Sequence, residues 1–519
     1  MKKYFLNIIC ITLGLVIIIS NSLRAQQVVN IQVQAANPTT TISKHIYGHF
    51  SEHLGRCIYD GFWVKDSMNI PKQDRIRLDV VEALKKIQIP NLRWPGGCFA
   101  DEYHWRDGIG VRDQRPKMIN TNWGNVTEDN SFGTHEFLEL CSLLKCEPYI
   151  TGNVGSGTVE EMSKWVEYLN FDGLSPMTVI RKQNGRDKPW NVHFWGVGNE
   201  SWGCGGNMTA DFYADQYKRY AGFTKNYPGN NLKRIASGAN ADDYNWTETM
   251  MKKVGPWMMW GLTLHYYTVP KNWGDKGSAT SFDESEYFTT MKKTLFMEEL
   301  VSKHSTIMDQ YDPEKKVALV VDEWGIWTNV EPGTNPGFLF QQNSLRDALI
   351  AGTNLNIFNN HADRVKMANL AQTINVLQSL ILTEGNKMIL TPTYHVFDLF
   401  KVHQEAKLLP VQFISPDYVN GKEKIPALNI SASKDSNGVV HITLINLDPN
   451  KSINLRTSLQ TINWSKVDGL ILSSAKLTDV NSFDKPDSVI PVTFIGAKKE
   501  ANDLIVNMPA KSIVMLTIK

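Results

Sequence analysis

Short apolar runs alternate with amphipathic segments over most of the chain, and this alternation predicts strands that are each followed by a helix. Eight runs have the length and the apolar content of buried strands: 45–50, 91–97, 148–152, 192–197, 234–239, 262–267, 317–321 and 367–372. The segments between them carry apolar residues at helical spacing: 73–88, 134–145, 159–169, 210–227, 246–254, 291–308 and 345–358. Eight strands separated by helices over roughly 350 residues predict a (β/α)8 TIM barrel, here placed at 45–402.

The pattern changes after about Val402, where helical periodicity gives way to short strands separated by Asn, Asp, Gly and Lys turns. These strands are expected at 411–414, 427–432, 439–446, 453–457, 492–495 and 513–518. They predict an all-β, jelly-roll-like sandwich over 403–519. A weakly alternating strand at 28–33, within the segment 26–44, is expected to join that sandwich.

The N-terminus has the layout of a secretory signal. Lys2 and Lys3 precede an apolar run at 8–19, and polar residues and Ala25 follow. We therefore expect a signal peptide at 1–25 and export to the periplasm or the extracellular space. Leu23 is an imperfect residue for the position three before the cleavage site, so an uncleaved anchor remains an alternative.

Charge and cysteine content exclude some classes of function. The chain has 54 Lys and Arg residues against 53 Asp and Glu residues, so no net field recruits nucleic acid or an anionic membrane. Five of the six cysteines lie beyond the signal segment, and none forms a CxxC pair. We expect mostly buried free thiols, with one disulfide left open, and no metal, nucleotide or flavin cofactor.

Two predicted strands end in glutamates. Glu200 follows the apolar run that ends in Gly198-Asn199, and Glu323 follows the run 317–321. Parallel barrel strands deliver their C-terminal ends to one face, so these carboxyl groups are expected to meet. A carboxyl pair of this kind suits glycoside hydrolysis, in which one group stays protonated and the other ionised. The alternative is that each glutamate forms a structural salt bridge or caps a helix.

Other polar residues share this position at or just beyond strand ends. In a barrel such residues should surround one site. They are Glu52, Arg93, Asn199, His265, Tyr267 and Gln372.

Five motifs resemble the α-L-arabinofuranosidases of glycoside hydrolase family 51. They are Gly-His-Phe-Ser-Glu-His-Leu-Gly-Arg at 48–56, Leu-Arg-Trp-Pro-Gly-Gly at 92–97, Trp-Gly-Val-Gly-Asn-Glu at 195–200, His-Tyr-Tyr at 265–267 and Asp-Glu-Trp at 322–324. The first is the most specific, and the motifs run through the whole predicted barrel in order. The resemblance implies a double displacement with retention, in which Glu200 is the general acid/base and Glu323 the nucleophile.

The same resemblance implies roles for the neighbouring residues. Asn199 would hydrogen-bond the sugar 2-hydroxyl, and Glu52 and Gln372 would contact other furanose hydroxyls. Arg93 and Tyr267 would hold the nucleophile ionised and oriented, since a guanidinium and a phenol both stabilise a carboxylate. The remaining two candidates would have indirect roles in substrate binding. His265 would orient other residues of the site, and Cys98 would shape the pocket, because a thiol is a weak hydrogen-bonding group.

The expected activity is removal of terminal α-L-arabinofuranosyl groups from arabinoxylan, arabinan or derived oligosaccharides by an exo-acting enzyme. Two alternatives remain: an endo-β-glucanase or β-xylosidase on the same kind of barrel, and a carbohydrate-binding protein without catalysis. The family resemblance also implies a homo-oligomer, often a hexamer.

Overall fold

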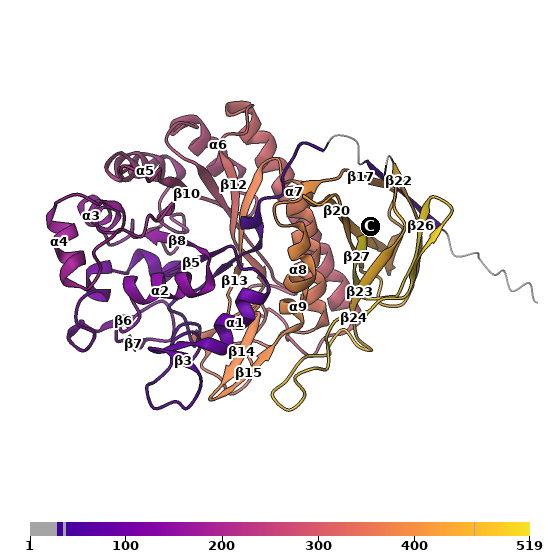
Figure 1. The fold of residues 1–519 in the computed structure, drawn as a ribbon, viewed down its shortest axis with the longest axis horizontal. Coiled ribbons are helices and arrows are strands. Elements are labelled where there is room, and N and C mark those ends of the chain that lie inside the picture. Colours follow the sequence, from indigo (N-terminus) through magenta and orange to yellow (C-terminus); the bar gives the residue numbers. More distant parts are fainter. Residues whose placement is uncertain (1–27, 35–37, 461) are drawn as a thin grey trace, which may run out of the picture.

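The computed structural model describes residues 28–34, 38–460 and 462–519, so the predicted signal segment 1–25 lies outside the described residues. The chain forms a closed parallel barrel and an all-β sandwich that lie side by side (Figure 1). The predicted fold class, a TIM barrel followed by a β-sandwich, is confirmed. In the part of the chain that is described, no helix is long and apolar enough to cross a membrane.

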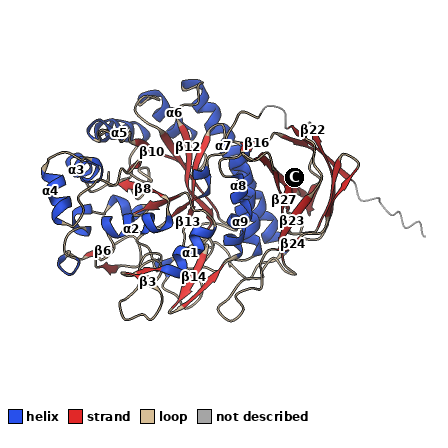
Figure 2. Ribbon diagram, viewed as in Figure 1, coloured by secondary structure: helices blue, strands red, loops and turns tan. Residues whose placement is uncertain are grey.

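Eight parallel strands close the barrel in the order β10-β11-β12-β13-β2-β5-β8-β9. Their bounds are β2 Gly48–Phe50, β5 Asn91–Trp94, β8 Glu147–Gly152, β9 Phe194–Val197, β10 Lys233–Asn240, β11 Gly261–Thr268, β12 Ala318–Ile326 and β13 Val365–Ala371. Helices surround the strands (Figure 2). They are α1 Leu78–Lys86, α2 Thr134–Leu144, α3 Val159–Asn170, α4 Pro176–Gln183, α5 Ala210–Phe223, α6 Tyr244–Lys253, α7 Glu284–Tyr311, α8 Leu345–Asn360 and α9 Pro392–Phe400.

Side-chain caps start six of these helices. A Thr, Ser or Asp at the N-cap accepts a hydrogen bond from a backbone N–H in the first turn, which would otherwise lack a partner. The caps of α3, α4, α5, α6, α7 and α9 are Thr158, Ser175, Thr209, Asp243, Asp283 and Thr391. The cap residues therefore determine where these six helices begin.

The barrel interior is a packed core rather than a channel. Side chains from alternate strands fill it, and all nine positions of β12 are buried. A separate apolar cluster inside the barrel consists of Tyr149, Phe194, Ile235, Ala318, Val320 and Met367. Because apolar side chains fill the lower layers, the polar side chains at the C-terminal strand ends form a floor for a site.

Two antiparallel-rich sheets make the sandwich. One has the order β17-β1-β22-β26-β25 and the other β16-β20-β21-β27-β23-β24. In the first sheet, β1 at Val28–Gln34 pairs with β17 on one side and β22 on the other. The further bounds are β16 Lys407–Leu408, β17 Val411–Phe413, β20 Leu428–Lys434, β21 Val440–Asn446, β22 Ile453–Gln460, β23 Val467–Ser473, β24 Val492–Thr493, β25 Ala497–Glu500, β26 Asp503–Met508 and β27 Ser512–Ile518.

Helix α8 lies between the barrel and the sandwich (Figure 1). Every residue from Leu345 to Asn359 is buried, since the barrel covers one side of the helix and the second sheet covers the other. Hydrogen bonds also cross this interface: Asn356 donates to the Asn429 side chain at 2.7 Å and accepts from Thr443 at 2.6 Å. The two domains therefore share one continuous core.

Four small hairpins extend the loops. They are β3–β4 (Lys72–Gln73 and Ile76–Arg77), β6–β7 (Met118–Asn120 and Val126–Glu128), β14–β15 (Ile381–Glu384 and Lys387–Leu390) and β18–β19 (Asp417–Asn420 and Glu423–Pro426). The first three follow barrel strands β2, β5 and β13, so they build the C-terminal face of the barrel. The turn of β6–β7 carries Trp123 into the site described next.

The predicted strand at 45–50 differs from the structure. Residues Lys44–Tyr47 form a 3-10 turn, in which the Ser43 side chain accepts from the His45 N–H, and only Gly48–Phe50 is extended. Ile46 and Tyr47 are both buried, and consecutive buried residues look alike in a buried strand and in a 3-10 turn.

Candidate active site

All nine predicted site residues lie at the C-terminal face of the barrel, on or just after its strands. Glu52 follows β2, Arg93 belongs to β5, and His265 belongs to β11 opposite Glu323 of β12. Six of the nine are buried, and Cys98, Glu200 and Tyr267 are partly exposed; the whole set is Glu52, Arg93, Cys98, Asn199, Glu200, His265, Tyr267, Glu323 and Gln372.

Glu323 is held by two donors, one from the neighbouring strand β11 and one from β5, three strands away in the barrel order. Arg93 Nη1 donates to Oε1 at 2.8 Å, and the Tyr267 hydroxyl donates to Oε2 at 2.8 Å. Each carboxylate oxygen thus has its own partner, so the group is fixed in position. The backbone of Gly97 passes so close that a Cβ there would lie 2.6 Å from Glu323 Oε1, which is why this position requires glycine.

Glu200 sits on a sharp turn just beyond β9. Its φ is +39°, in the left-handed region that a residue with a side chain adopts at a cost of about 1 kcal/mol or more. Gly198, two residues earlier, also has a positive φ of +79°. The N–H groups of Gly203 and Gly205 donate to the Glu200 carbonyl at 2.7 and 3.1 Å. The backbone that follows therefore keeps this carboxyl group aimed at the centre of the face.

The two glutamates are close and differ in surroundings. A carboxylate oxygen of Glu200, a ring nitrogen of His265 and a carboxylate oxygen of Glu323 all lie within 4.8 Å of one another. Burial, and then the negative charge of Glu323, raise the pKa of Glu200, although the nearby His265 opposes the rise. Glu323 instead contacts a guanidinium and a phenol, so the environment favours a proton on Glu200.

His265 is a buried imidazolium between carboxylates. Its Nδ1 donates to Glu200 at 3.0 Å and its Nε2 donates to Asp322 at 2.9 Å. Burial alone would lower its pKa, but Glu323 and Asp322 outweigh burial and raise the pKa of His265 to about 10. The ring therefore stays charged over the neutral range and links the two acids.

Asp322 is a site residue that the strand pattern did not single out. It is fully buried, accepts from the Tyr149 hydroxyl at 2.8 Å and pairs with Arg93 Nε at 3.3 Å. Burial would raise its pKa, but Arg93 and His265 hold the pKa of Asp322 below its usual value. The signal was available in the sequence, because an aspartate ends the apolar run 317–321 directly before Glu323.

Glu52 follows β2, which is two strands from β12 in the barrel order. Its Oε1 accepts from Trp123 Nε1 at 2.9 Å and from the Gly97 N–H at 3.0 Å, and its Oε2 accepts from Gln372 Nε2 at 2.8 Å. Burial and the charge of Glu323 raise the pKa of Glu52 to about 7. Trp123 is a second residue that sequence reasoning missed, since it comes from a hairpin between strands.

Asn199 is positioned from both its side chain and its backbone. Arg93 Nη2 donates to the Asn199 amide oxygen at 2.6 Å, and the Asn199 amide NH2 lies 3.9 Å from Cys204 Sγ, a weak acceptor. The Asn199 N–H donates to buried Asp101 at 2.8 Å, and Asp101 also accepts from the N–H groups of Val154 and Gly155. Asp101, also missed from the sequence, thereby ties the loops after β5, β8 and β9 together.

Cys98 is not the free thiol that the sequence reasoning assumed. It forms a disulfide with Cys204, across 106 residues, which joins the loop after β5 to the turn after β9. Glu200 Oε2 lies 3.4 Å from Cys204 Sγ and 4.0 Å from Cys98 Sγ. The other cysteines in the described ranges are free: Cys57, Cys141 and Cys146.

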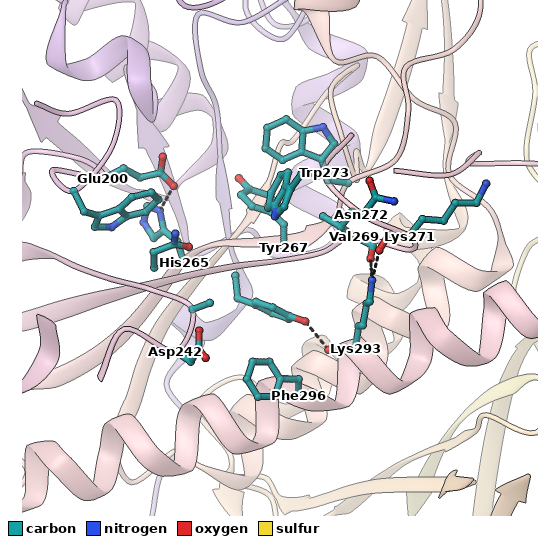
Figure 3. Close-up of a pocket in the computed structure, with 15 residues that line it drawn as sticks. Glu200, Asp242, His265, Tyr267, Val269, Lys271, Asn272, Trp273, Lys293 and Phe296 are labelled. Carbon is teal, nitrogen blue, oxygen red and sulfur yellow. Dashed lines mark hydrogen bonds and ion pairs between the residues drawn. The ribbon is translucent and has the colours of Figure 1, made fainter. Parts of the chain in front are cut away.

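A cavity of about 620 Å³ opens beside Glu200. Figure 3 shows Glu200 and His265 on one side of it, with Lys271 and Asn272 across from them. Its lining is rich in aromatic side chains, which can cover the faces of sugar rings. They are Trp202, Tyr266, Tyr267, Trp273, Phe296 and Trp327.

Two groups of side chains have the spacing of metal ligands. One consists of Glu200, His265 and Glu323, and the other of Cys98, Glu200 and Cys204. Both ring nitrogens of His265 already contact carboxylates, so the first group offers a metal two oxygens and no free imidazole lone pair. The two sulfurs of the second group are bonded to each other.

Comparisons with characterised proteins identify relatives over nearly the full chain. A Bacteroides ovatus protein named intracellular exo-alpha-L-arabinofuranosidase is 52% identical over 501 residues, which are 96% of this chain and 97% of that protein. The alpha-L-arabinofuranosidase C of Emericella nidulans is 30% identical over 459 residues, 83% of this chain and 87% of the relative.

The name of the Bacteroides relative overturns the predicted export. That protein, similar over 96% of this chain, is named an intracellular enzyme, and the predicted periplasmic or extracellular location and the signal peptide lose their support. The prediction depended on the hydrophobic pattern of 1–25 alone. That pattern lacks the small residue that a signal peptidase needs at position 23, where Leu23 stands.

Family models and a solved structure agree on the relationship. Residues 83–286 match the alpha-L-arabinofuranosidase 1 domain, and residues 322–512 match the alpha-L-arabinofuranosidase C-terminal domain. The crystal structure of the GH51 arabinofuranosidase from Xanthomonas axonopodis pv. citri superimposes with a TM-score of 0.94 at 49% identity, covering 95% of this chain and 100% of that one. With its paired glutamates just after β9 and within β12, the chain belongs to the α-L-arabinofuranosidases of glycoside hydrolase family 51.

Proposed function

We propose that this protein is a retaining, exo-acting α-L-arabinofuranosidase that releases terminal non-reducing α-L-arabinofuranosyl groups from arabinan, arabinoxylan or derived oligosaccharides. One observation carries the proposal: carboxylate oxygens of Glu200 and Glu323 lie within 4.8 Å of each other, in environments that favour a proton on Glu200. Retaining glycosidases place their two carboxyl groups about 5–5.5 Å apart, and inverting enzymes place them farther apart.

In the first step, Glu323 attacks the anomeric carbon while Glu200 donates its proton to the leaving oxygen. Arg93 and Tyr267 each donate to one oxygen of the attacking carboxylate and hold it in position, which supports this assignment of roles. In the second step, Glu200 takes a proton from water, and the water displaces Glu323 from the sugar. This chemistry requires no cofactor.

Polar groups around the pair suit the hydroxyls of one furanose ring. The amide NH2 of Asn199, whose protein partner is the weak acceptor Cys204 Sγ, would donate to the 2-hydroxyl, and Glu52 and Gln372 would bind other hydroxyls of the ring. The glycine at position 97 lets the ring approach the nucleophile closely. The aromatic cavity beside Glu200 would hold the leaving group, because Glu200 is the member of the pair that lines it.

The test is hydrolysis of an aryl α-L-arabinofuranoside by the full chain, followed by proton NMR of the first sugar released. We expect α-L-arabinofuranose to appear before mutarotation, and we expect arabinose as the sole early product from arabinan and arabinoxylan. Hydrolysis of aryl β-xylosides or β-glucan in place of arabinofuranosides would overturn the proposed sugar. Release of longer oligosaccharides would overturn the exo action, and binding of these glycans without hydrolysis would overturn catalysis.

A substitution at His265 should change the pH profile in a defined direction. The imidazolium lowers the pKa of Glu200, so His265→Gln should raise that pKa. Activity requires protonated Glu200, so it is present below this pKa and falls as the pH rises through it. The alkaline limb of kcat/KM should therefore move to higher pH in His265→Gln.

Tyr267→Phe is the matched control for this experiment, because it removes a contact to Glu323 and leaves the contact between His265 and Glu200 in place. Its alkaline limb should stay where it is in the wild type. An alkaline limb that moves to lower pH in His265→Gln would contradict the proposed role of the imidazolium.

We also propose that the protein is a homo-oligomer, a hexamer by family resemblance. Light scattering on the purified full chain measures this directly, and a mass equal to one chain would exclude it.

A further inference from the structure

The disulfide beside Glu200 is exposed to solvent, and its two sulfur atoms are soft metal ligands once they are reduced to thiolates. Cys204 is exposed and Cys98 is partly exposed, so dissolved reagents can reach the sulfurs. The free cysteines in the described part of the chain are different, because Cys57 and Cys141 are buried and Cys146 lies at the start of β8, at the other end of the barrel. These three are already thiols, so within the described residues the bond that a reductant can break is the Cys98–Cys204 disulfide.

Reduction would turn this pair into two thiols that face a carboxylate. A small dithiol accomplishes this by two exchanges: the Cys98–Cys204 bond breaks, each sulfur gains an electron and a proton, and the dithiol becomes a cyclic disulfide. The Cα atoms are 5.5 Å apart, so side-chain rotation can bring the sulfurs to the ~3.8 Å separation that two thiolates need at a tetrahedral metal with bonds of ~2.3 Å.

We propose that the reduced protein carries a site for a thiophilic divalent cation such as Zn²⁺ or Cd²⁺, made of Cys98, Cys204 and Glu200. These three residues already form a cluster of metal-ligand spacing, in which one carboxylate oxygen lies 3.4 and 4.0 Å from the two sulfurs. Two sulfurs and one oxygen leave a fourth tetrahedral position for water. Binding releases the thiol protons and occupies Glu200, so the metal inhibits the reduced enzyme.

The oxidised protein should not bind such a cation at this place. A disulfide supplies no thiolate, and thiolates are the ligands that select soft metals. The remaining nearby donors are Glu200 and Glu323, since both ring nitrogens of His265 are engaged by carboxylates. Arg93 occupies one oxygen of Glu323 as well, so this group is a poor alternative site.

The experiment titrates Cd²⁺ into the full chain in both redox states and records the sulfur-to-cadmium absorption in the ultraviolet. All samples carry Cys146→Ser, because Cys146 lies beside Cys141 and this second pair of thiols would bind cadmium independently. One half is reduced with dithiothreitol and desalted without oxygen, and the other half is left oxidised. We expect one Cd²⁺ per chain, with absorption in the reduced sample alone.

Three variants test the ligand set. Cys98→Ser and Cys204→Ser should each lose the absorption. Glu200→Gln should keep it while its Cd²⁺ affinity falls by at least the ~10–100-fold that loss of a partner around a metal costs. Circular dichroism checks that each variant is folded, and the comparison of the two redox states of the parent protein needs no variant at the site.

Activity provides a second, separate measurement. Cd²⁺ should inhibit hydrolysis in the reduced sample, and a chelator should restore it. Equal absorption in both redox states, absorption that persists in Cys204→Ser, or no absorption in either state would overturn the metal site. Absorption without inhibition would overturn Glu200 as a ligand. Because the absorption does not depend on hydrolysis, a failure of the proposed activity is distinguishable from a failure of this site.

Discussion

Replacement of Glu323 by Gln lowers kcat by ~10⁴–10⁶-fold, the expected result for loss of a covalent nucleophile. The amide has the shape of the carboxylate but cannot form the glycosyl–enzyme bond. Arg93 and Tyr267 then face a neutral group in place of an anion. Steady-state kinetics on an aryl α-L-arabinofuranoside measures the loss, and thermal unfolding shows whether the variant stays folded.

Glu136→Gln is the control for Glu323→Gln. Glu136 is also a buried acid paired with an arginine, since Arg115 Nη2 donates to it at 2.9 Å, but it lies at the start of α2 and away from the site. Its neutralisation should reduce stability and leave kcat near the wild-type value. Retention of more than a few per cent of activity in Glu323→Gln would contradict its role as the nucleophile.

Glu200→Ala gives the second large effect, a fall in kcat of ~10²–10⁴-fold on natural glycans. The loss should shrink for aryl substrates whose leaving group departs without a proton, because the first step then needs no acid. Added azide should restore turnover, since the small anion fits the space left by the carboxyl group and needs no general base. The product should be an arabinofuranosyl azide with the α configuration of the substrate.

Azide also distinguishes the catalytic roles of the two glutamates. In Glu323→Ala, azide should take the place of the nucleophile and give the β azide, the inverted product. An inverted azide from Glu200→Ala would exchange the two roles. Equal losses on aryl substrates and on glycans in Glu200→Ala would contradict the acid role. Thin-layer chromatography detects the azides, and NMR assigns their configuration.

The barrel and most of the site were predictable because their signals are local. Each strand is one apolar run, and its last residues are the ones that reach the site, as Glu200 after β9 and Glu323 within β12 demonstrate. The 3-10 turn at Lys44–Tyr47 was not predictable, since it buries the same residues as a strand would.

The missed residues act through contacts that bridge distant segments. The partner of Cys98 lies 106 residues away, and five cysteines allow many pairings. Asp101 matters because three backbone N–H groups from two later loops converge on it. Trp123 reaches Glu52 from a hairpin whose pairing carries no strong pattern.

The burial of α8 from Leu345 to Asn359 limits how this enzyme can be rebuilt. The barrel is not a module that can be excised or fused alone, because removal of the sandwich would expose one side of a helix that is buried all round and would break the hydrogen bond from Asn356 to Asn429. Additional modules are better attached on the outer sheet that contains β1 and β22, where they leave the shared core intact. In engineered versions of this enzyme, the barrel and the sandwich must therefore be kept together.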